Sequence, residues 1–592
     1  MSLFVERRRP ALSPDFLLRV LLAWVMIAAL LIVTNLASII AYRFPDPDDA
    51  LRLVQVRDLL GGQAWFDLAQ HRVDAPGGGV PMHWSRLVDL PVAIVILSLG
   101  WLIGQGPAEM VALIGIPILT FGIALLLAGR IAWRLVGDEA TGFACLAMAL
   151  SVPVIEQLRP MRIDHHGWQI VCALAVMNAL MARRPIVGGW VAGVVMAVWL
   201  SISIEGLPLA AAVCGVTALR GLRDRHDSAW FVGTHQGLAA GSAVLFALTR
   251  GMNDLSQYCD AISPAHIAAF AVGACGATIM ARVEPLPRFA QISGFAIVAG
   301  VTFATLQGIA PGCAGDAFAS LDPLVRTFWY NGVSEGLPIW HQSPGVALQI
   351  AIPPLVALVA CLQLAARNGA WLRRWWLDYA IILFAAFVVS LFVARAGAVA
   401  GALAAVPLGW RIREWLRSAR NLRRPGRRVL VMAGIALALL PAMPLTLLSM
   451  ARPAQASSGD SPILASSCRI GTSADLLNEL PRGEIFAPFD IGPELLLETD
   501  HTVVATSHHR GADAMRMTIA AFLGTPDAAH EALKARGTRY VAVCPSLNEP
   551  TRYRAAAPTG FMAHLLDGRA PAWLEPVSVP GDGQLNIWRI RD

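Results

Sequence analysis

Carboxylate and imidazole side chains gather in three short stretches, and each stretch borders a long apolar segment. The first stretch carries Asp46, Asp48 and Asp49, the second is Asp164-His165-His166, and the third centres on Glu335. Carboxylates and imidazoles are the side chains that hold divalent cations. A cation at a membrane surface suits chemistry on a phosphate-bearing lipid, so these stretches predict a metal-assisted site for such a substrate.

Each stretch also has a structural interpretation that involves no ligand. The aspartates of the first stretch surround prolines, a pattern that is typical of a helix cap or a solvated loop. Two histidines at a helix start are common as capping or hydrogen-bonding groups. Glu335 lies among aromatic residues, so it is also compatible with an interfacial aromatic belt that contains one exposed acid.

Two further charged residues stand beside apolar segments. Arg395 interrupts an alanine-rich apolar stretch, where a charge is costly and often functional. Its guanidinium would match a lipid phosphate, although snorkelling to the interface also explains it. Glu205 is either a further ligand or an interfacial acid, and the sequence favours the second interpretation. Residues 204–208 (Ile-Glu-Gly-Leu-Pro) echo residues 334–338 (Ser-Glu-Gly-Leu-Pro), but one pentapeptide does not establish a repeat.

The composition indicates a polytopic α-helical membrane protein. Of the 592 residues 56% are hydrophobic and only 15% are charged, and the mean hydropathy is +0.56. A soluble protein of this length needs far more polar surface. The net charge of +6 comes mainly from arginines in short loops between apolar segments, as expected of cytoplasmic anchors. This pattern argues against nucleic acid as a partner.

Apolar segments of helical length predict about thirteen transmembrane helices. They cover residues 17–42, 107–133, 139–156, 167–183, 186–203, 207–220, 229–249, 264–281, 287–309, 345–366, 377–394, 397–410 and 429–450. The arginine-rich loops, above all residues 411–428, predict a cytoplasmic face and a cytoplasmic N-terminus.

The remaining loops then face outward, and they contain all three stretches. External loops are expected at 43–106, 157–166, 204–206, 250–263 and 310–344, together with everything after 450. If the apolar residues 90–104 also crossed, the basic loop near Arg130 would fall on the outer side. We therefore expect residues 90–104 to pack on the outer face without crossing. The sequence therefore divides into a transmembrane part, 1–450, and an external part, 451–592.

The external part is predicted to be a soluble α/β domain of about 140 residues, long enough to bury its own core. It opens with a linker at 453–461. Strand-like runs at 502–505 and 540–543 alternate with helical runs at 513–523 and 527–535.

Four of the nine cysteines fall in predicted external segments: Cys259, Cys313, Cys468 and Cys544. Two disulfides in an oxidising compartment and four free thiols are both compatible with the sequence.

Taken together and in order, these residues resemble the catalytic subunit of oligosaccharyltransferases, membrane enzymes of the GT-C fold. Asp46 to Arg52 is similar to the family's first acidic motif, and residues 79–89, with His83, to the loop that follows it. Asp164-His165-His166 resembles the second motif in its archaeal form, where the aspartate and the second histidine hold the metal. Residues 333–335 (Val-Ser-Glu) resemble an element of the mobile external loop, and Arg395 stands where the family binds phosphate.

The resemblance implies the following site. Asp46, Asp164 and His166 hold Mn²⁺ or Mg²⁺, Arg395 binds the lipid phosphate, and Glu335 or Asp46 orients the acceptor. Further candidates are Asp48, Asp49, His165 and Asp490. The partners would be a polyprenyl-linked glycan donor, membrane lipids and a protein, glycan or lipid acceptor, at a bacterial inner membrane with the C-terminal domain in the periplasm.

One motif departs from the family. Where the family has Trp-Trp-Asp-Tyr-Gly, which reads the acceptor, residues 488–492 are Pro-Phe-Asp-Ile-Gly, so an acceptor other than an asparagine sequon is expected. A transporter or flippase, a polymerase or ligase for lipid-linked glycans, and a catalytically silent assembly protein remain as alternatives. A transporter would place its charges near the middle of the membrane on broken helices and show inverted repeats.

Overall fold

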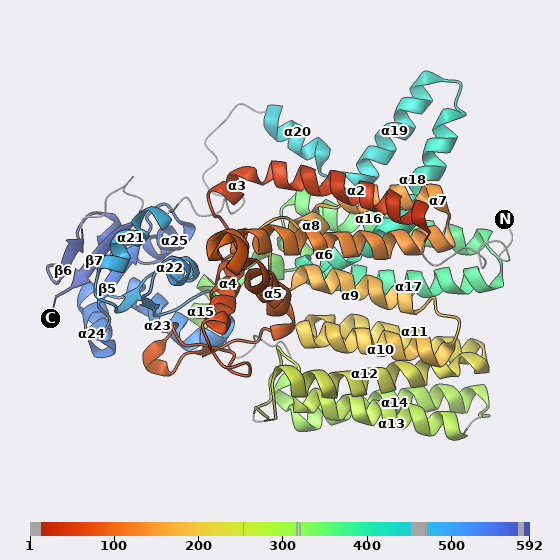
Figure 1. Ribbon diagram of the computed structural model, residues 1–592, viewed down its shortest axis with the longest axis horizontal. Coiled ribbons are helices and arrows are strands. Elements are labelled where there is room, and N and C mark those ends of the chain that lie inside the picture. The colour runs from red at the N-terminus through yellow and green to blue at the C-terminus, as the bar shows by residue number, and fades with distance from the viewer. Residues whose placement is uncertain are drawn as a thin grey trace. The chain divides into compact units, whose positions relative to one another are not determined.

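A computed structural model describes residues 13–252, 254–283, 285–314, 318, 321–451, 468, 470–577 and 585–591. The chain forms two compact units (Figure 1). Unit 1 comprises Met1–Ala37, Ser85–Ala317 and Ser334–Gln455, and unit 2 comprises Ser38–Trp84, Phe318–Val333 and Ala456–Asp592. Unit 2 thus combines the C-terminal part with two loops that the sequence predicts to be external. The predicted linker at 453–461 lies outside the described residues.

Unit 1 is built from long helices, many of which begin with proline in the first turn, where its missing N–H costs nothing. The helices are α2 (Pro14–Thr34), α5 (Arg86–Ile103), α6 (Gln105–Leu135), α7 (Asp138–Ala149), α8 (Val152–Glu156), α9 (His166–Ala179), α10 (Pro185–Ile202), α11 (Leu207–Arg223), α12 (Ser228–Thr249), α13 (Pro264–Val283), α14 (Arg288–Ile309), α16 (Pro344–Arg367), α17 (Ala370–Phe392), α18 (Gly397–Arg420), α19 (Pro425–Leu439) and α20 (Met443–Ala451). The short helix α3 (Leu36–Ile40) follows α2.

Among the described residues, 10 helices are long and apolar enough to cross a membrane, which confirms a polytopic membrane protein. The other predicted spans are also helical, but α7, α9 and α19 are shorter than 18 residues and α18 is rich in arginine. Helix α5 is among the 10 by length and composition, whereas the sequence predicts that residues 90–104 stay outside. The number of crossings therefore remains a prediction.

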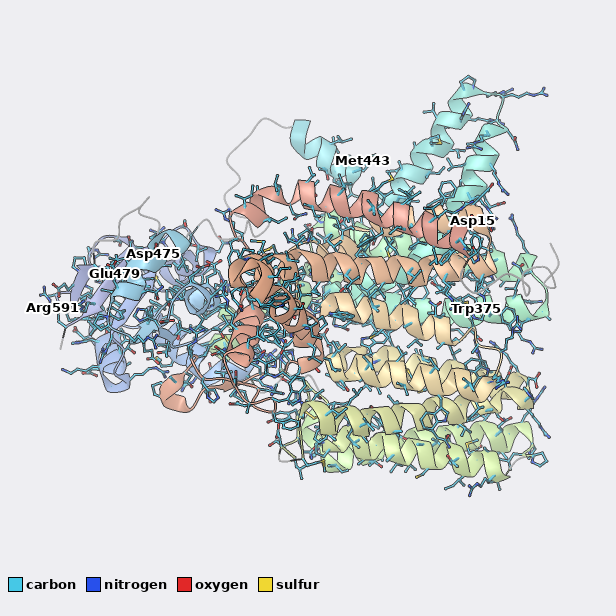
Figure 2. The ribbon with its side chains drawn as sticks, in the orientation of Figure 1. Asp15, Trp375, Met443, Asp475, Glu479 and Arg591 are labelled. Atoms are coloured by element: carbon cyan, nitrogen blue, oxygen red, sulfur yellow. A yellow bond between two sulfur atoms is a disulfide. The ribbon has the colours of Figure 1, made fainter. Side chains whose placement is uncertain are left out.

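Small residues let α10 and α12 approach closely. A methyl group added to Gly193 would lie 2.3 Å from the carbonyl oxygen of Thr234, and one added to Gly237 would lie 2.5 Å from that of Trp190. Such glycine-lined contacts are typical of helices that pack within a membrane. Helix α17 contributes buried aromatic side chains to the core. Trp375 (Figure 2) and Trp376 are buried, and the buried Tyr379 donates its O–H to the Leu403 carbonyl at 2.5 Å.

Unit 2 contains a five-stranded mixed sheet of order β4-β3-β5-β7-β6, which confirms the α/β character of the C-terminal part. Strands β4 and β5 are parallel to β3, while β7 is antiparallel to β5 and β6. The strands are β3 (Glu484–Phe486), β4 (Thr502–Val503), β5 (Tyr540–Val543), β6 (Leu574–Val577) and β7 (Asn586–Ile590). The accompanying helices are α21 (Gly471–Glu479), α22 (Gly492–Glu498), α23 (Ala512–Leu523), α24 (Pro526–Arg536), α25 (Asn548–Ala556) and α26 (Phe561–Leu566).

The first predicted external loop packs against this sheet within unit 2. It contains α4 (Pro47–Leu60) and a hairpin of β1 (Ala69–Gln70) and β2 (Val80–Pro81), and the second added loop contains α15 (Pro323–Phe328). Val503 of β4 donates its N–H to the Arg72 carbonyl at 2.9 Å, and its own carbonyl accepts from Asp74 at 3.0 Å. These bonds extend the sheet edge into the loop.

Two disulfides close loops in segments that the sequence predicts to be external. Cys259 pairs with Cys313 in unit 1, and Cys468 pairs with Cys544 in unit 2. Of the two interpretations that the sequence left open, the structure therefore shows the bridged one.

Candidate active site

Breaks between the helices of unit 1 bring charged residues from four segments together. Asp164 and its two histidines lie where α9 begins. Glu205 occupies the short 3₁₀ turn η2 (Ile204–Gly206) between α10 and α11, and Arg395 occupies η8 (Ala394–Ala396) between α17 and α18. Glu335 occupies η6 (Ser334–Gly336). Helix ends allow polar side chains to converge at one end of an apolar bundle without crossing it.

Asp164, His165 and His166 form a compact buried group. One Asp164 oxygen lies 2.7 Å from His165 Nδ1, and the other lies 3.3 Å from His166 Nε2. Their candidate ligand atoms all lie within 4.8 Å of one another. One carboxylate and two imidazoles fit a first-row divalent cation such as Mn²⁺ or Zn²⁺ better than Mg²⁺, which prefers oxygen ligands.

Gln169, which sequence reasoning missed, connects this group to Glu205. Its side-chain nitrogen lies 3.2 Å from His166 Nδ1 and donates to a Glu205 oxygen at 3.2 Å. Its oxygen accepts the indole N–H of Trp199 at 3.2 Å, which fixes the orientation of the amide. The amide therefore holds the His166 ring and the Glu205 carboxylate in one arrangement.

Arg395 lies between two glutamates and completes the arrangement. One of its terminal nitrogens donates to Glu205, and the other donates to Glu335 at 3.3 Å. The same Glu335 oxygen lies 3.8 Å from His166 Nε2, and the other oxygen lies 3.5 Å from Arg162. We call the group Asp164, His166, Gln169, Glu205, Glu335 and Arg395 the outer-ring cluster.

The charges of this cluster and of Arg162, which neighbours Glu335, favour a divalent cation. Asp164, Glu205 and Glu335 supply three negative charges against the two positive charges of Arg162 and Arg395. A divalent cation would turn this small negative excess into a small positive one. The loaded cluster would then attract a phosphate, which suits a lipid-phosphate substrate.

The two glutamates that contact Arg395 lie in similar short sequences. Glu205 and Glu335 occupy equivalent positions in the two Glu-Gly-Leu-Pro sequences, each of which forms a 3₁₀ turn. The sequence favoured an interfacial acid at Glu205, but the structure pairs it with Arg395.

The aspartates of the first stretch belong to unit 2. Asp46 caps α4, accepting the Asp48 N–H at 2.9 Å, and Asp49 lies fully buried in the first turn. These contacts match the helix-cap interpretation. The participation of Asp46, Asp48 or Asp49 in metal binding stays a prediction.

Asp490 occupies η9 (Phe489–Ile491), also in unit 2. The carboxylate of Glu549, which the sequence did not single out, accepts the backbone N–H groups of Phe489 and Asp490, both at 3.0 Å, and the Tyr553 O–H at 2.5 Å. Burial, followed by the charge of Asp490, raises the pKa of Glu549 above its ordinary value. The turn that contains Asp490 is thus held by a buried acid.

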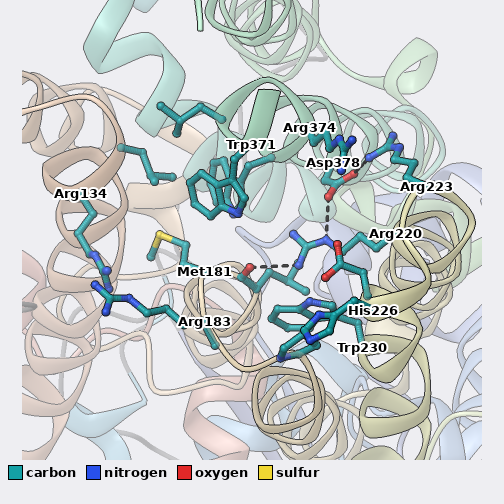
Figure 3. A pocket seen from close by; sticks show the side chains of 17 residues that line it. Arg134, Met181, Arg183, Arg220, Arg223, His226, Trp230, Trp371, Arg374 and Asp378 are labelled. Atoms are coloured by element: carbon teal, nitrogen blue, oxygen red, sulfur yellow. Dashed lines mark hydrogen bonds and ion pairs between the residues drawn. The ribbon is translucent and has the colours of Figure 1, made fainter. Parts of the chain in front are cut away.

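A second charged region lies at the other ends of the same unit 1 helices (Figure 3). A cavity of about 390 Å³ is bordered by residues at the ends of α9 and α11 and at the start of α17. There Asp378 accepts from Arg220 at 2.8 Å and from Arg223 at 2.6 Å, and Arg220 stacks 4.6 Å above the Trp230 ring. Helices α9, α11 and α17 therefore separate this arginine-rich end from the outer-ring cluster.

No protein-family profile matches the sequence, and no curated protein matches it. Solved structures do match. An oligosaccharyltransferase from the archaeon Archaeoglobus fulgidus, AglB, in complex with an inhibitory peptide and a dolichol-phosphate, is 14% identical, with 94% of this chain and 72% of that chain covered and a TM-score of 0.62. Its apo form is 13% identical, with 94% and 73% covered and a TM-score of 0.63.

A mycobacterial arabinofuranosyltransferase, AftD, is 16% identical, with 98% of this chain but only 40% of that chain covered and a TM-score of 0.51. At these identities the likeness is one of fold. It extends over most of this chain and agrees with the resemblance carried by the motifs. The chain is therefore a multi-pass membrane protein with the GT-C fold of membrane glycosyltransferases.

Proposed function

We propose that this protein is a membrane glycosyltransferase that moves a sugar or oligosaccharide from a polyprenyl-phosphate or -diphosphate donor to an acceptor. The observation that carries the proposal is the placement of Arg395 between Glu205 and Glu335, beside Asp164 and His166. A guanidinium next to candidate metal ligands is suited to bind the phosphate of a leaving group.

The reaction breaks the bond between the anomeric carbon and the phosphate oxygen. A new bond forms from the acceptor atom to that carbon, the acceptor loses a proton, and the lipid phosphate leaves with the bonding electrons. Asp164 and His166 would hold the divalent cation. A bound cation would neutralise negative charge that develops on the leaving phosphate.

Arg395 has two roles in this scheme. Its guanidinium donates to the phosphate, and Glu205 and Glu335 fix its orientation before the substrate arrives. When the phosphate binds, Arg395 can exchange its contact with Glu335 for one with the phosphate. Glu335 is then free to accept a hydrogen bond from the acceptor and orient it.

A lipid-phosphate donor is supported by AglB, which was solved with a dolichol-phosphate, and sugar transfer in general is supported by AftD, which is an arabinofuranosyltransferase. The acceptor stays open among a protein, a glycan and a lipid, since Asp490 lies in a turn without the family's two tryptophans. The predicted location is a bacterial inner membrane with the C-terminal domain in the periplasm. The two disulfides support an oxidising compartment for the external segments.

The test is consumption of lipid-linked glycans, extracted from the source cells, by the purified full-length protein in detergent with Mn²⁺ and with acceptor fractions from the same cells. Wild type should consume the donor, and Asp164→Ala should not. Glu156→Ala is the matched control, because Glu156 is a half-exposed acid whose ion pair is with Arg159. Equal consumption by wild type and Asp164→Ala would refute the site. Addition of total membrane protein, glycan or lipid fractions separates the three acceptor classes.

A further inference from the structure

Three histidines meet in unit 2, and none of them belongs to the outer-ring cluster. His83 follows the short strand β2, and His508 and His509 stand 425 residues later, where η10 (His509–Gly511) begins. The two segments are held together by the backbone bonds between Val503 and the first loop, and by Arg510, which donates to the Met82 carbonyl at 3.3 Å. The histidines are thus carried by parts of the chain that are fixed side by side.

The spacing of these rings matches a metal centre. One ring nitrogen of each histidine lies within 4.8 Å of the others, and His83 Nδ1 lies 2.9 Å from His508 Nε2. The ring centroids are 4.8 to 5.0 Å apart. Nitrogens that bind one tetrahedral Zn²⁺ at about 2.0–2.1 Å lie roughly 3.3 Å from each other. The His83–His508 pair is slightly closer than that and the other nitrogens lie within 4.8 Å, so small ring movements would bring three nitrogens to one ion.

Aromatic side chains surround the three rings and fix their directions. The Trp84 indole packs edge-on against His508 at 5.3 Å. His509 stacks on Trp329 at 6.3 Å and meets Phe318 edge-on at 5.4 Å. An apolar shell of this kind controls solvent access and stiffens metal ligands. His508 is buried, whereas His83 and His509 are half-exposed, which leaves one side open to water.

We propose that His83, His508 and His509 bind a first-row transition metal ion of the Zn²⁺ class, with water in the fourth position. The group contains only imidazoles, which select Zn²⁺, Co²⁺ or Ni²⁺ over the Mg²⁺ and Mn²⁺ that carboxylates favour. The ion joins the first predicted external loop to the C-terminal domain within unit 2. The proposal does not depend on the glycosyltransferase assignment, because it uses none of the residues of the outer-ring cluster.

The test uses the purified full-length protein, stripped with a chelator and titrated with Zn²⁺ and Co²⁺. Wild type should bind Zn²⁺ at this site, and bound Co²⁺ should give the intense visible absorption of tetrahedral coordination. His83→Gln and His508→Gln should weaken Zn²⁺ binding at least tenfold, since loss of even an outer partner of a metal ligand costs about 10- to 100-fold. His564→Gln is the matched control, because its ring hydrogen-bonds to the Gly560 carbonyl elsewhere in unit 2.

Two further variants separate this site from folding defects and from the outer-ring cluster. His509→Cys should keep Co²⁺ binding and add a thiolate-to-cobalt absorption band, which a merely structural role would not produce. Asp164→Ala should retain the tetrahedral Co²⁺ signal. Unchanged Zn²⁺ affinity in both His→Gln variants, a Co²⁺ signal lost only in Asp164→Ala, or the absence of tetrahedral Co²⁺ in wild type would each overturn the proposal. Binding of inorganic phosphate in place of Zn²⁺ would also overturn it.

Discussion

Replacing Arg395 with lysine tests whether the forked guanidinium, and not only its charge, is needed for transfer. Arg395 contacts Glu205 with one terminal nitrogen and Glu335 with the other. A lysine keeps the positive charge but has one nitrogen at the end of a flexible stem. It cannot reproduce the fork that holds Glu205 with one nitrogen and leaves the other for Glu335 or the phosphate.

The expected loss follows from the number of contacts. One hydrogen bond to a charged group contributes about 1.5–3 kcal/mol, which corresponds to roughly a 10- to 160-fold loss in kcat/KM for the lipid-linked donor. Arg395→Gln should lose more, because it also removes the charge that compensates two neighbouring carboxylates. Both variants should keep the wild-type elution volume in gel filtration if the loss is catalytic.

The assay is the initial rate of donor consumption at several donor concentrations in Mn²⁺. Arg417→Lys is the matched control, because Arg417 also contacts two carboxylates, Glu139 and Glu414, but is 55% exposed. Exposed pairs contribute only about 0–1 kcal/mol, so this variant should behave as wild type. A kcat/KM for Arg395→Lys within twofold of wild type would refute the reasoning.

Three other predictions concern single residues and bonds. Glu205→Gln should weaken donor turnover, since Arg395 loses one of its two orienting charges, and a rate equal to that of Glu156→Gln would contradict this role. Reduction of the Cys468–Cys544 disulfide should lower the free energy of unfolding by about 2–4 kcal/mol in urea, and an unchanged midpoint would contradict it. Burial raises the pKa of Glu549, so above about pH 4.5 the folded chain keeps a proton that the unfolded chain releases, and stability falls as pH rises towards the folded pKa. Glu549→Gln should flatten this slope in thermal melts, and an unaltered slope would count against a protonated Glu549.

Much of the fold follows from local sequence. Apolar segments of helical length mark the membrane helices, because backbone groups in a bilayer must pair within their own segment. Short β-branched runs such as residues 502–505 and 540–543 mark strands of the C-terminal sheet. Whether α5 crosses the membrane does not follow from its own sequence, because the answer depends on how many of the other helices cross.

The candidate site was less accessible from sequence. Asp164, Glu335 and Arg395 attract attention as charges beside apolar segments, but an amide such as Gln169 within a helix gives no such signal. Its role depends on contacts with Trp199 and Glu205, which folding alone brings together. The sequence also did not predict that His83, His508 and His509 lie together, because only folding brings them together.

Glycosyl transfer at the outer-ring cluster is tested most directly by metal removal and return. Purified wild type would be stripped with a chelator, mixed with extracted polyprenyl-linked glycans and with the protein, glycan and lipid fractions that supply the acceptor, and then given Mn²⁺ while donor and released lipid phosphate are measured. Consumption should stop on stripping and return with Mn²⁺, with one lipid phosphate released per donor consumed, and Asp164→Ala should stay inactive throughout. Consumption that persists without metal, or that Asp164→Ala shares, would contradict the assignment of this cluster as a metal-assisted glycosyltransferase site.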